Sequence, residues 1–188
     1  MLLLVVLVGA VTLLGKNASS KFSRIDTAIG VPTVPLPTTT TPPVWTPWTS
    51  PDGKFTADFP GVPRLLDNPP GARTVSVAEA QLVVGNALYD AGTAELKPEY
   101  YYPNDEAGLT KAINIAAEQF KVTVLAPTMG NFAGVNYMDA MITGTLDGTT
   151  VRGSTRVFVV GQRIFYAVAF STDGSHDFTR FVDSFRQL

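Results

Sequence analysis

The feature that most restricts the fold is a series of β-type runs in the second half of the chain. These runs are rich in β-branched and aromatic residues, and two hairpin signals, Asp147-Gly148 and Gly161-Gln162, separate the last three of them. Strands joined by such short turns pair antiparallel. The second half therefore predicts an antiparallel sheet, with strands at residues 122–126, 132–146, 150–160 and 163–171.

Further β-type runs precede these. Residues 54–59 alternate between apolar and polar side chains, as in a half-buried strand. We expect two more strands at residues 73–80 and 81–90. Residues 91–103 are predicted to be irregular.

Two helices complete the pattern. The first is predicted to start after Asn104, a good N-cap, with Asp105 and Glu106 in its positively polarised first turn. The second is predicted to start after Ser175, which would cap it. Each helix has one apolar face at helical spacing. These faces consist of Leu109, Ile113, Ala116, Ala117 and Phe120, and of Phe178, Phe181, Val182 and Phe185.

Together the elements predict an α+β fold, in which an antiparallel β-sheet of about six strands has two main helices packed on it. Residues 164–170 are apolar at every position. A central strand that is covered on both faces has this pattern. We therefore expect helices to cover one or both faces of the sheet.

The composition excludes several classes of function. The 188 residues carry a formal net charge of −2 without a basic block, which argues against a nucleic-acid partner. The absence of cysteine excludes disulfides, thiolate catalysis and lipidation at a cysteine, and the single histidine, His176, leaves little for a metal site. We expect a domain that needs no metal and no cofactor.

The N-terminal segment, residues 1–15, is apolar. Residues 2–15 contain no charged side chain, but a helix needs about 20 residues to span a bilayer. Three interpretations are open: a short or truncated membrane anchor, a cleaved signal peptide, and a buried helix of the domain. We favour the anchor over a buried helix because a polar linker separates the segment from the core.

A linker rich in proline and threonine follows at residues 16–44, and the folded domain is predicted at residues 45–188. Extended Pro/Thr segments of this kind are common on exported proteins. Lys16, Lys21 and Arg24 would favour the cytoplasmic side of a membrane, but we give the linker more weight. We expect a single-pass protein of the cell membrane, with its C-terminal domain outside the cytoplasm.

Three motifs give the domain a resemblance to a known family. They are SPDGKFTADFPGVPR near its start, TVRGSTRVFVVGQRIFYAVAFS later, and FTRFVDSFRQL at its end. The domain resembles the PsbP-like α/β fold, and in particular actinobacterial exported proteins of the LpqN type. PsbP is a non-catalytic extrinsic subunit of a photosynthetic membrane complex, so the resemblance implies a binding or accessory module. LpqN-type proteins are usually lipidated at a cysteine, and this chain has none. If it is related to them, it would be held at the membrane by its apolar N-terminal segment instead.

Several residues invite a functional interpretation that the sequence does not favour. Ser175-His176-Asp177 contains the residue types of a catalytic triad, but neighbours at a helix start point in different directions, so a helix cap is the better interpretation. Trp45 and Trp48 are expected to anchor the start of the domain on its core. Spacing alone identifies no pair of catalytic carboxylates.

The candidate binding residues are Tyr100, Tyr101, Tyr102 and Arg64. The three tyrosines lie in the longest irregular stretch, and Arg64 lies in a second loop at residues 61–71. Loops carry function more often than core positions, and tyrosine combines a large contact area with a polar tip. We predict that at least one tyrosine is exposed beside a groove. The expected function is an accessory module that binds a protein, lipid or glycan; a cell-envelope hydrolase or lyase is the alternative.

Overall fold

The computed structural model describes residues 43–66, 68–71, 73–174 and 178–188. The predicted N-terminal anchor and nearly all of the predicted linker lie outside these residues, and so does Ser175-His176-Asp177. In the described ranges, no helix is both long and apolar enough to cross a membrane. The expectations for the N-terminal segment therefore stay predictions.

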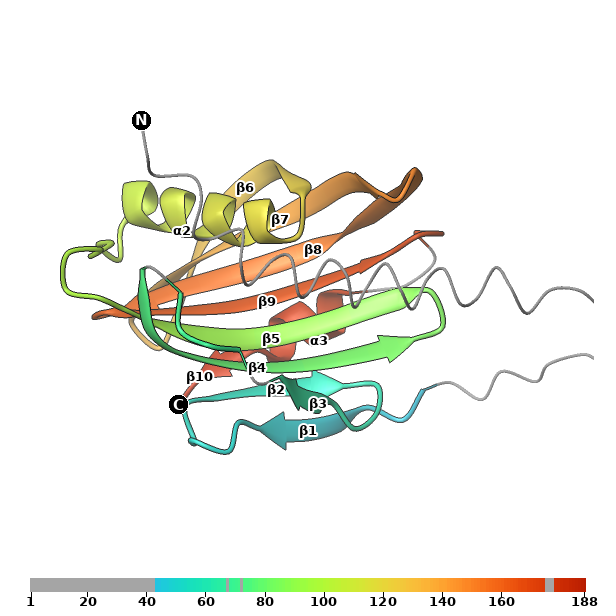
Figure 1. Cartoon of the computed structure of the whole chain (residues 1–188), viewed down its shortest axis with the longest axis horizontal. Helices are drawn as coiled ribbons and strands as arrows, with labels where there is room; N and C mark the ends of the chain where they lie inside the picture. The colour runs from blue at the N-terminus through green and yellow to red at the C-terminus, as the bar shows by residue number, and fades with distance from the viewer. Residues whose placement is uncertain (1–42, 67, 72, 175–177) are drawn as a thin grey trace, which may run out of the picture.

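The described residues form strands and helices in nearly continuous succession (Figure 1). The helices are α2 (Glu106–Gln119) and α3 (Thr179–Ser184). The strands are β1 (Thr46–Thr49), β2 (Phe55–Phe59), β3 (Arg64–Leu66), β4 (Thr74–Val84), β5 (Ala87–Leu96), β6 (Val122–Phe132), β7 (Val135–Leu146), β8 (Thr149–Val160), β9 (Arg163–Ser171) and β10 (Arg186–Gln187).

The strands make two antiparallel sheets. The large sheet has seven strands in the order β3-β4-β5-β9-β8-β7-β6, and the small sheet has three in the order β1-β2-β10. The predicted antiparallel α+β class is confirmed, although the chain has more strands than the expected six. The extra ones are short strands, such as β1, β3 and β10, which carry little periodic signal.

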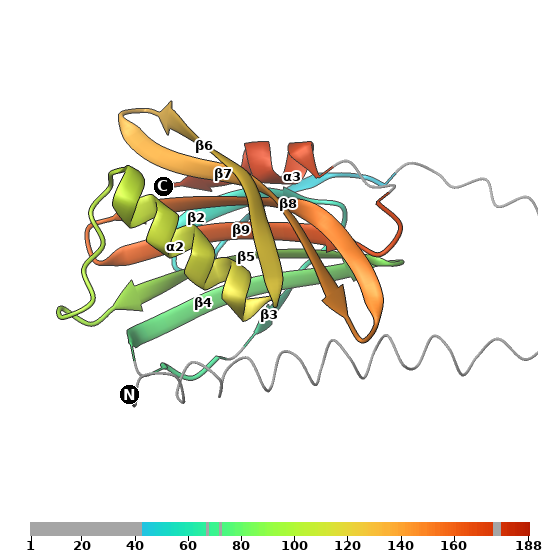
Figure 2. The same ribbon diagram turned by 90° about the horizontal axis from the view of Figure 1, so that it is seen from above.

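The elements lie in three layers (Figures 1 and 2). Helix α2 covers one face of the large sheet, here called the α2 face, while α3 and the small sheet cover the opposite α3 face. Successive side chains of a strand point to opposite faces, and the buried residues divide accordingly. Ile142 and Val168 pack with α2, whereas Phe158 and Ala167 pack with β2 and α3.

The prediction of a doubly covered central strand is confirmed. Strand β9 lies in the middle of the large sheet, between β5 and β8. All residues from Ile164 to Phe170 are buried. Their side chains point alternately into the two hydrophobic cores, so every apolar position of this segment is buried.

The boundaries predicted for the first long hairpin are wrong. Strand β4 continues through Ala80 and Gln81, and the chain reverses at Gly85-Asn86, where Gly85 adopts a left-handed conformation with φ of 58°. A glycine accepts this conformation without a steric cost. Strand β5 then continues to Leu96, so half of the segment expected to be irregular is strand.

The chain also reverses at a second place that the sequence pattern does not predict. The predicted strand at residues 132–146 is divided by a tight turn at Ala133-Gly134, and β6 runs on to Phe132. The pairing of β6 with β7 is irregular between Leu125 and Thr128. Two long ribbon-like strands therefore stand at this edge of the large sheet (Figure 2).

Helix α2 begins one residue later than predicted. Its N-cap is Asp105, whose side chain accepts a hydrogen bond of 2.8 Å from the Gly108 amide. Asn104 instead bonds the backbone of two strands: its amide group donates to the Val159 carbonyl at 2.6 Å, and its Oδ1 accepts from the Asn136 amide at 3.0 Å. The predicted apolar face of α2 is buried, which confirms its orientation.

Helix α3 and the small sheet close the other core. The helix begins after Phe178, three residues later than predicted, so the predicted cap at Ser175 is wrong, and no side chain among the described residues caps the helix. All four predicted apolar residues are buried. Trp45 packs edge-on against Tyr89 at 5.8 Å, and Trp48 contacts Phe55 and Phe59. The structure thus confirms that the two tryptophans anchor the start of the domain.

Candidate functional site

The three predicted tyrosines follow β5 and precede α2. Tyr100 and Tyr102 are half-buried against the core on the α2 face, and the Arg73 guanidinium lies 5.7 Å from the ring centre of Tyr100. Tyr101 is 57% exposed. Two of the rings therefore fix this segment to the domain, and one ring remains open to solvent.

This arrangement predicts different effects of removing neighbouring rings. Tyr101→Ala is expected to leave the midpoint of thermal unfolding nearly unchanged, because its ring is exposed. The matched control, Tyr102→Ala, is expected to lower the free energy of unfolding by about 1–2 kcal/mol through lost apolar burial. Equal effects of the two substitutions on the unfolding midpoint would contradict this assignment.

The fourth predicted residue, Arg64, lies in strand β3 rather than in the predicted loop, and it is far from the tyrosines. It pairs with Gln81 in the large sheet, whereas the segment with the tyrosines leaves the sheet at Leu96, opposite Thr74. Gln81 and Thr74 are separated along β4 by more than about 20 Å, at about 3.3 Å per residue. The structure therefore does not bring Arg64 and the tyrosines into one site.

Arg64 instead contacts a buried group of polar side chains, which we call the acid cluster. Its members are Glu79, Gln81, Asp90 and Tyr166. Arg64 donates to Gln81 Oε1 at 3.0 Å, and Gln81 donates to Asp90 Oδ2 at 2.9 Å. Glu79 and Asp90 are 1% and 0% exposed and lie beside each other.

The surroundings of the two carboxyl groups of the acid cluster favour their protonated form. Among the described residues, no donor reaches Glu79 Oε1 or Asp90 Oδ1. Two ionised carboxylates only accept hydrogen bonds, so contact between them needs a proton. Burial, and then the charge and hydrogen bond of Glu79, raise the pKa of Asp90 well above its ordinary value. Burial also raises the pKa of Glu79, against hydrogen bonds from Asp90 and Asn68.

Tyr166 completes the acid cluster from β9. Its ring crosses Gly92, where a Cβ atom would lie 2.5 Å from the tyrosine oxygen, so glycine is needed there. The hydroxyl lies beside Glu79 but outside ordinary hydrogen-bonding geometry. Burial, followed by the charges of Glu79 and Asp90, raises the pKa of Tyr166 well above its ordinary value.

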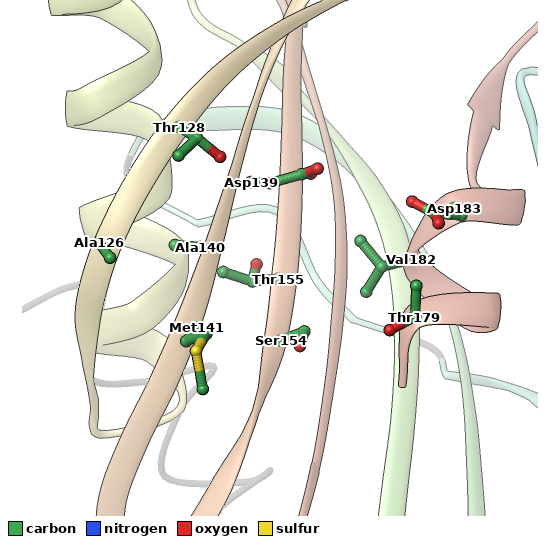
Figure 3. A pocket seen from close by; sticks show the side chains of 10 residues that line it. All are labelled: Ala126, Thr128, Asp139, Ala140, Met141, Ser154, Thr155, Thr179, Val182 and Asp183. Carbon is green, nitrogen blue, oxygen red and sulfur yellow. The ribbon is translucent and has the colours of Figure 1, made fainter. Parts of the chain in front are cut away.

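A second polar assembly lies on the α3 face, around a cavity of about 210 Å³ between α3 and the β6–β8 strands (Figure 3). We call this cavity the α3 pocket. The carboxylates of Asp139 and Asp183 point toward each other from opposite walls, and Met141 and Ser154 lie along the β7–β8 wall. The full lining consists of Ala126, Thr128, Asp139, Ala140, Met141, Ser154, Thr155, Thr179, Val182 and Asp183.

Arg156 holds the two carboxylates of the α3 pocket. Its Nε and Nη2 atoms donate to the two oxygens of Asp139 at 2.6 and 2.7 Å, and Nη2 also donates to Asp183 at 2.9 Å. Its guanidinium lies 4.2 Å from the ring centre of Tyr137. Burial alone would lower the pKa of Arg156, but the hydrogen bonds and charge of Asp139 raise it above its ordinary value.

An apolar pair borders the α3 pocket. Leu125 and Met141 face each other across β6 and β7 and are 43% and 61% exposed. Met129 is also exposed, but it pairs with Met138, which is buried in the core on the α2 face. The two exposed methionines of this ribbon therefore lie on opposite faces.

Comparisons with known proteins identify the fold. No protein-family model matches the chain, and no curated protein sequence matches it. The solution structure of cyanobacterial PsbP from Synechocystis is similar, with a TM-score of 0.55 over 84% of this chain and 100% of that chain, at 6% identity. The fold is PsbP-like. At this identity, the similarity is evidence of the fold alone.

Two other solved structures are more distant. A Bacteroides thetaiotaomicron protein aligns over 76% of this chain and 48% of its own, with a TM-score of 0.46 and 7% identity. A Pseudomonas aeruginosa protein aligns over 68% of this chain and 83% of its own, with a TM-score of 0.39 and 11% identity. Neither contributes to the interpretation of the site.

Within the described part of the chain, no group of three or more histidine, cysteine, aspartate or glutamate side chains is placed to hold a metal ion. The carboxylates of the α3 pocket already bind Arg156. The pocket thus presents acidic and hydroxyl groups beside an apolar wall.

The residues of the α3 pocket differ from the four predicted binding residues. One signal in the sequence was available, because Asp139 and Arg156 lie eight residues before Asp147 and eight after Gly148, the predicted turn. Hairpin register places such residues opposite each other. Asp183 has no comparable signal, because its place depends on how α3 packs.

Proposed function

We propose that this protein is a membrane-anchored, extracytoplasmic accessory module without catalytic activity, which binds a partner protein at the α3 pocket. The observation that carries the proposal is the exposed apolar pair, Leu125 and Met141, beside a hollow with polar walls. Apolar side chains that gather next to such a hollow are typical of interaction surfaces. Tyr101 and Arg64 remain secondary candidates for contacts with a partner.

The state of the carboxylates supports binding rather than catalysis. Asp139 and Asp183 both accept hydrogen bonds from Arg156. These hydrogen bonds occupy carboxylate lone pairs that would otherwise be open to accept a proton from a substrate. These groups are therefore better suited to orient a ligand than to move its protons.

A cell-envelope hydrolase or lyase is the alternative function. The acid cluster favours it in one respect, because carboxyl groups with raised pKa values occur at catalytic sites. However, Glu79, Asp90 and Tyr166 are at most 5% exposed. A substrate would have to enter the core of the domain to reach them, so we favour the binding module.

The location outside the cytoplasm rests on the N-terminal sequence. An uncharged apolar segment at residues 2–15 precedes a Pro/Thr-rich linker that leads into the domain. This order is typical of a domain held at a distance from a membrane. We also propose a relationship to LpqN-type exported proteins, with the N-terminal segment in place of a lipidated cysteine.

A labelling experiment on intact producing cells tests the proposal. The chain contains no cysteine, so Met141→Cys creates a single reactive thiol beside the α3 pocket. A membrane-impermeant maleimide with a photoactivated crosslinking group is attached and irradiated. We expect a discrete crosslinked adduct from Met141→Cys. The matched control, Met129→Cys, is 46% exposed on the other face and is expected to react with the maleimide without giving this adduct.

Two outcomes would contradict the proposal. If neither cysteine reacts in intact cells but both react after lysis, the domain lies inside the cytoplasm. If both positions react and give the same adducts, the α3 pocket has no preference for a partner.

A further inference from the structure

The walls of the α3 pocket differ in chemistry. The carboxylates of Asp139 and Asp183 face each other across the cavity (Figure 3). The rest of the lining includes apolar side chains, with Met141 on the sheet and Val182 on α3. We infer that the α3 pocket binds a lysine side chain of the partner protein, and this inference rests on the proposed function.

The charges around the pocket favour a cation. Two carboxylates line the cavity, whereas the guanidinium of Arg156, which bridges them through Nη2, is only 5% exposed and is not part of the lining. The side chains of Asp139 and Asp183 are 31% and 58% exposed, so both remain accessible from the cavity. The charged side chains that line the cavity are therefore both acidic.

Other charged groups lie at the edges of this region. Arg186 stacks 4.4 Å from the ring centre of Phe132 and donates to the Phe185 carbonyl at 2.7 Å. Arg180 pairs with Asp58 at 3.4 Å. Burial and the charge of Arg156 lower the pKa of Arg186, against the charges of Asp183 and Asp139, so Arg186 lies within reach of these carboxylates. Neither Arg180 nor Arg186 lines the pocket.

The geometry of Asp139 favours lysine over arginine. A guanidinium binds best when it donates two parallel hydrogen bonds to one carboxylate. Both oxygens of Asp139 already accept such a pair from Arg156. An ammonium group is a compact charge with three donors, so it needs only one lone pair from each of several oxygens. The oxygen atoms of Asp139, Asp183 and Ser154 line the pocket and can supply these lone pairs.

The apolar wall matches the remainder of a lysine side chain. Lysine buries its methylene stem along apolar surface while its charged end stays polar. In the α3 pocket, Met141 and Val182 are placed for the stem, and the facing carboxylates are placed for the ammonium group. The exposed Leu125 beside Met141 extends the apolar surface toward the partner.

The test uses the methionine methyl groups of the full chain in a non-ionic detergent. Methionines labelled with carbon-13 at the methyl group give separate NMR signals, and Met141 lies in the pocket while Met129 and Met138 do not. N-acetyl-lysinamide is the probe, and N-acetyl-norleucinamide is the matched control with a similar stem and no charge. We expect the lysine probe to move the Met141 signal with saturation, and the signals of Met129 and Met138 to stay in place.

A charge variant then links binding to the acidic wall. Asp183→Asn keeps the shape of the side chain and is expected to weaken lysine binding about two- to five-fold, the effect of one exposed ion pair. The control is Asp147→Asn, which makes the same charge change at the exposed turn between β7 and β8 and is expected to have no effect. Binding is also expected to weaken as salt is added.

Three results would overturn the inference. Equal movement of the Met141 signal by the norleucine control would show an apolar surface without charge recognition. Tighter binding of N-acetyl-argininamide than of the lysine probe would show that the choice of cation is wrong. Failure of the lysine probe to move the Met141 signal at any concentration would exclude this ligand, whereas the crosslink from Met141→Cys would still support a protein partner of other chemistry.

Discussion

Replacing Arg156 by methionine is expected to lower the free energy of unfolding by about 3 kcal/mol. The side chain is buried and donates three hydrogen bonds to Asp139 and Asp183. Removing one member of a buried ion pair typically costs about 3–5 kcal/mol because its partner is left without a counter-charge. The lower end of this range applies here, since both carboxylates keep some contact with water.

Chemical denaturation monitored by tryptophan fluorescence measures this effect. The control is Arg152→Met, which removes a charge from an exposed position of the same strand and is expected to change stability by less than about 0.5 kcal/mol. Arg156→Lys should fall between the two, because it keeps the charge but loses the paired hydrogen bonds to Asp139. If Arg156→Met is no more harmful than Arg152→Met, the ion-pair network does not support the α3 pocket.

The contacts of Arg156 also show which parts of the candidate site can be predicted from the sequence alone. The turn at Asp147-Gly148 was predicted correctly, and a two-residue turn fixes which residues of its two strands face each other. The contact between Asp139 and Arg156 was therefore predictable, although it was not predicted. The contact between Asp183 and Arg156 was not predictable, because Asp183 reaches Arg156 only after α3 packs against the sheet.

The acid cluster illustrates the opposite case. Gly85-Asn86 is also a hairpin signal, but it lies inside an apolar run, and the turn was placed before Gln81 instead. That error hid the pairing of Gln81 with Asp90. Burial of Glu79 depends further on the loop that supplies Asn68, and a local pattern cannot specify such a contact. Strands and helix faces follow from periodicity, whereas polar sites assembled from distant segments do not.

Replacing Asp90 by asparagine is expected to stabilise the protein at pH 7 and to remove much of its loss of stability with rising pH. The folded protein raises the pKa values of Asp90 and Glu79 above the ordinary 3.8 and 4.5. The folded state therefore retains a proton that the unfolded state releases. Stability from this proton is complete below about pH 4 and is lost as the pH rises toward the pKa of the folded pair.

Asparagine reproduces the hydrogen bonds without the proton. Its oxygen can accept from Gln81, and its amide group can donate to Glu79. The advantage of Asp90→Asn over the wild type should grow between pH 4 and pH 7 by about 1.4 kcal/mol for each unit by which folding raises the pKa. Urea denaturation at several pH values measures it, with Asp147→Asn as the exposed control. Parallel pH curves for the wild type and Asp90→Asn would mean that the acid cluster holds no proton in the folded state.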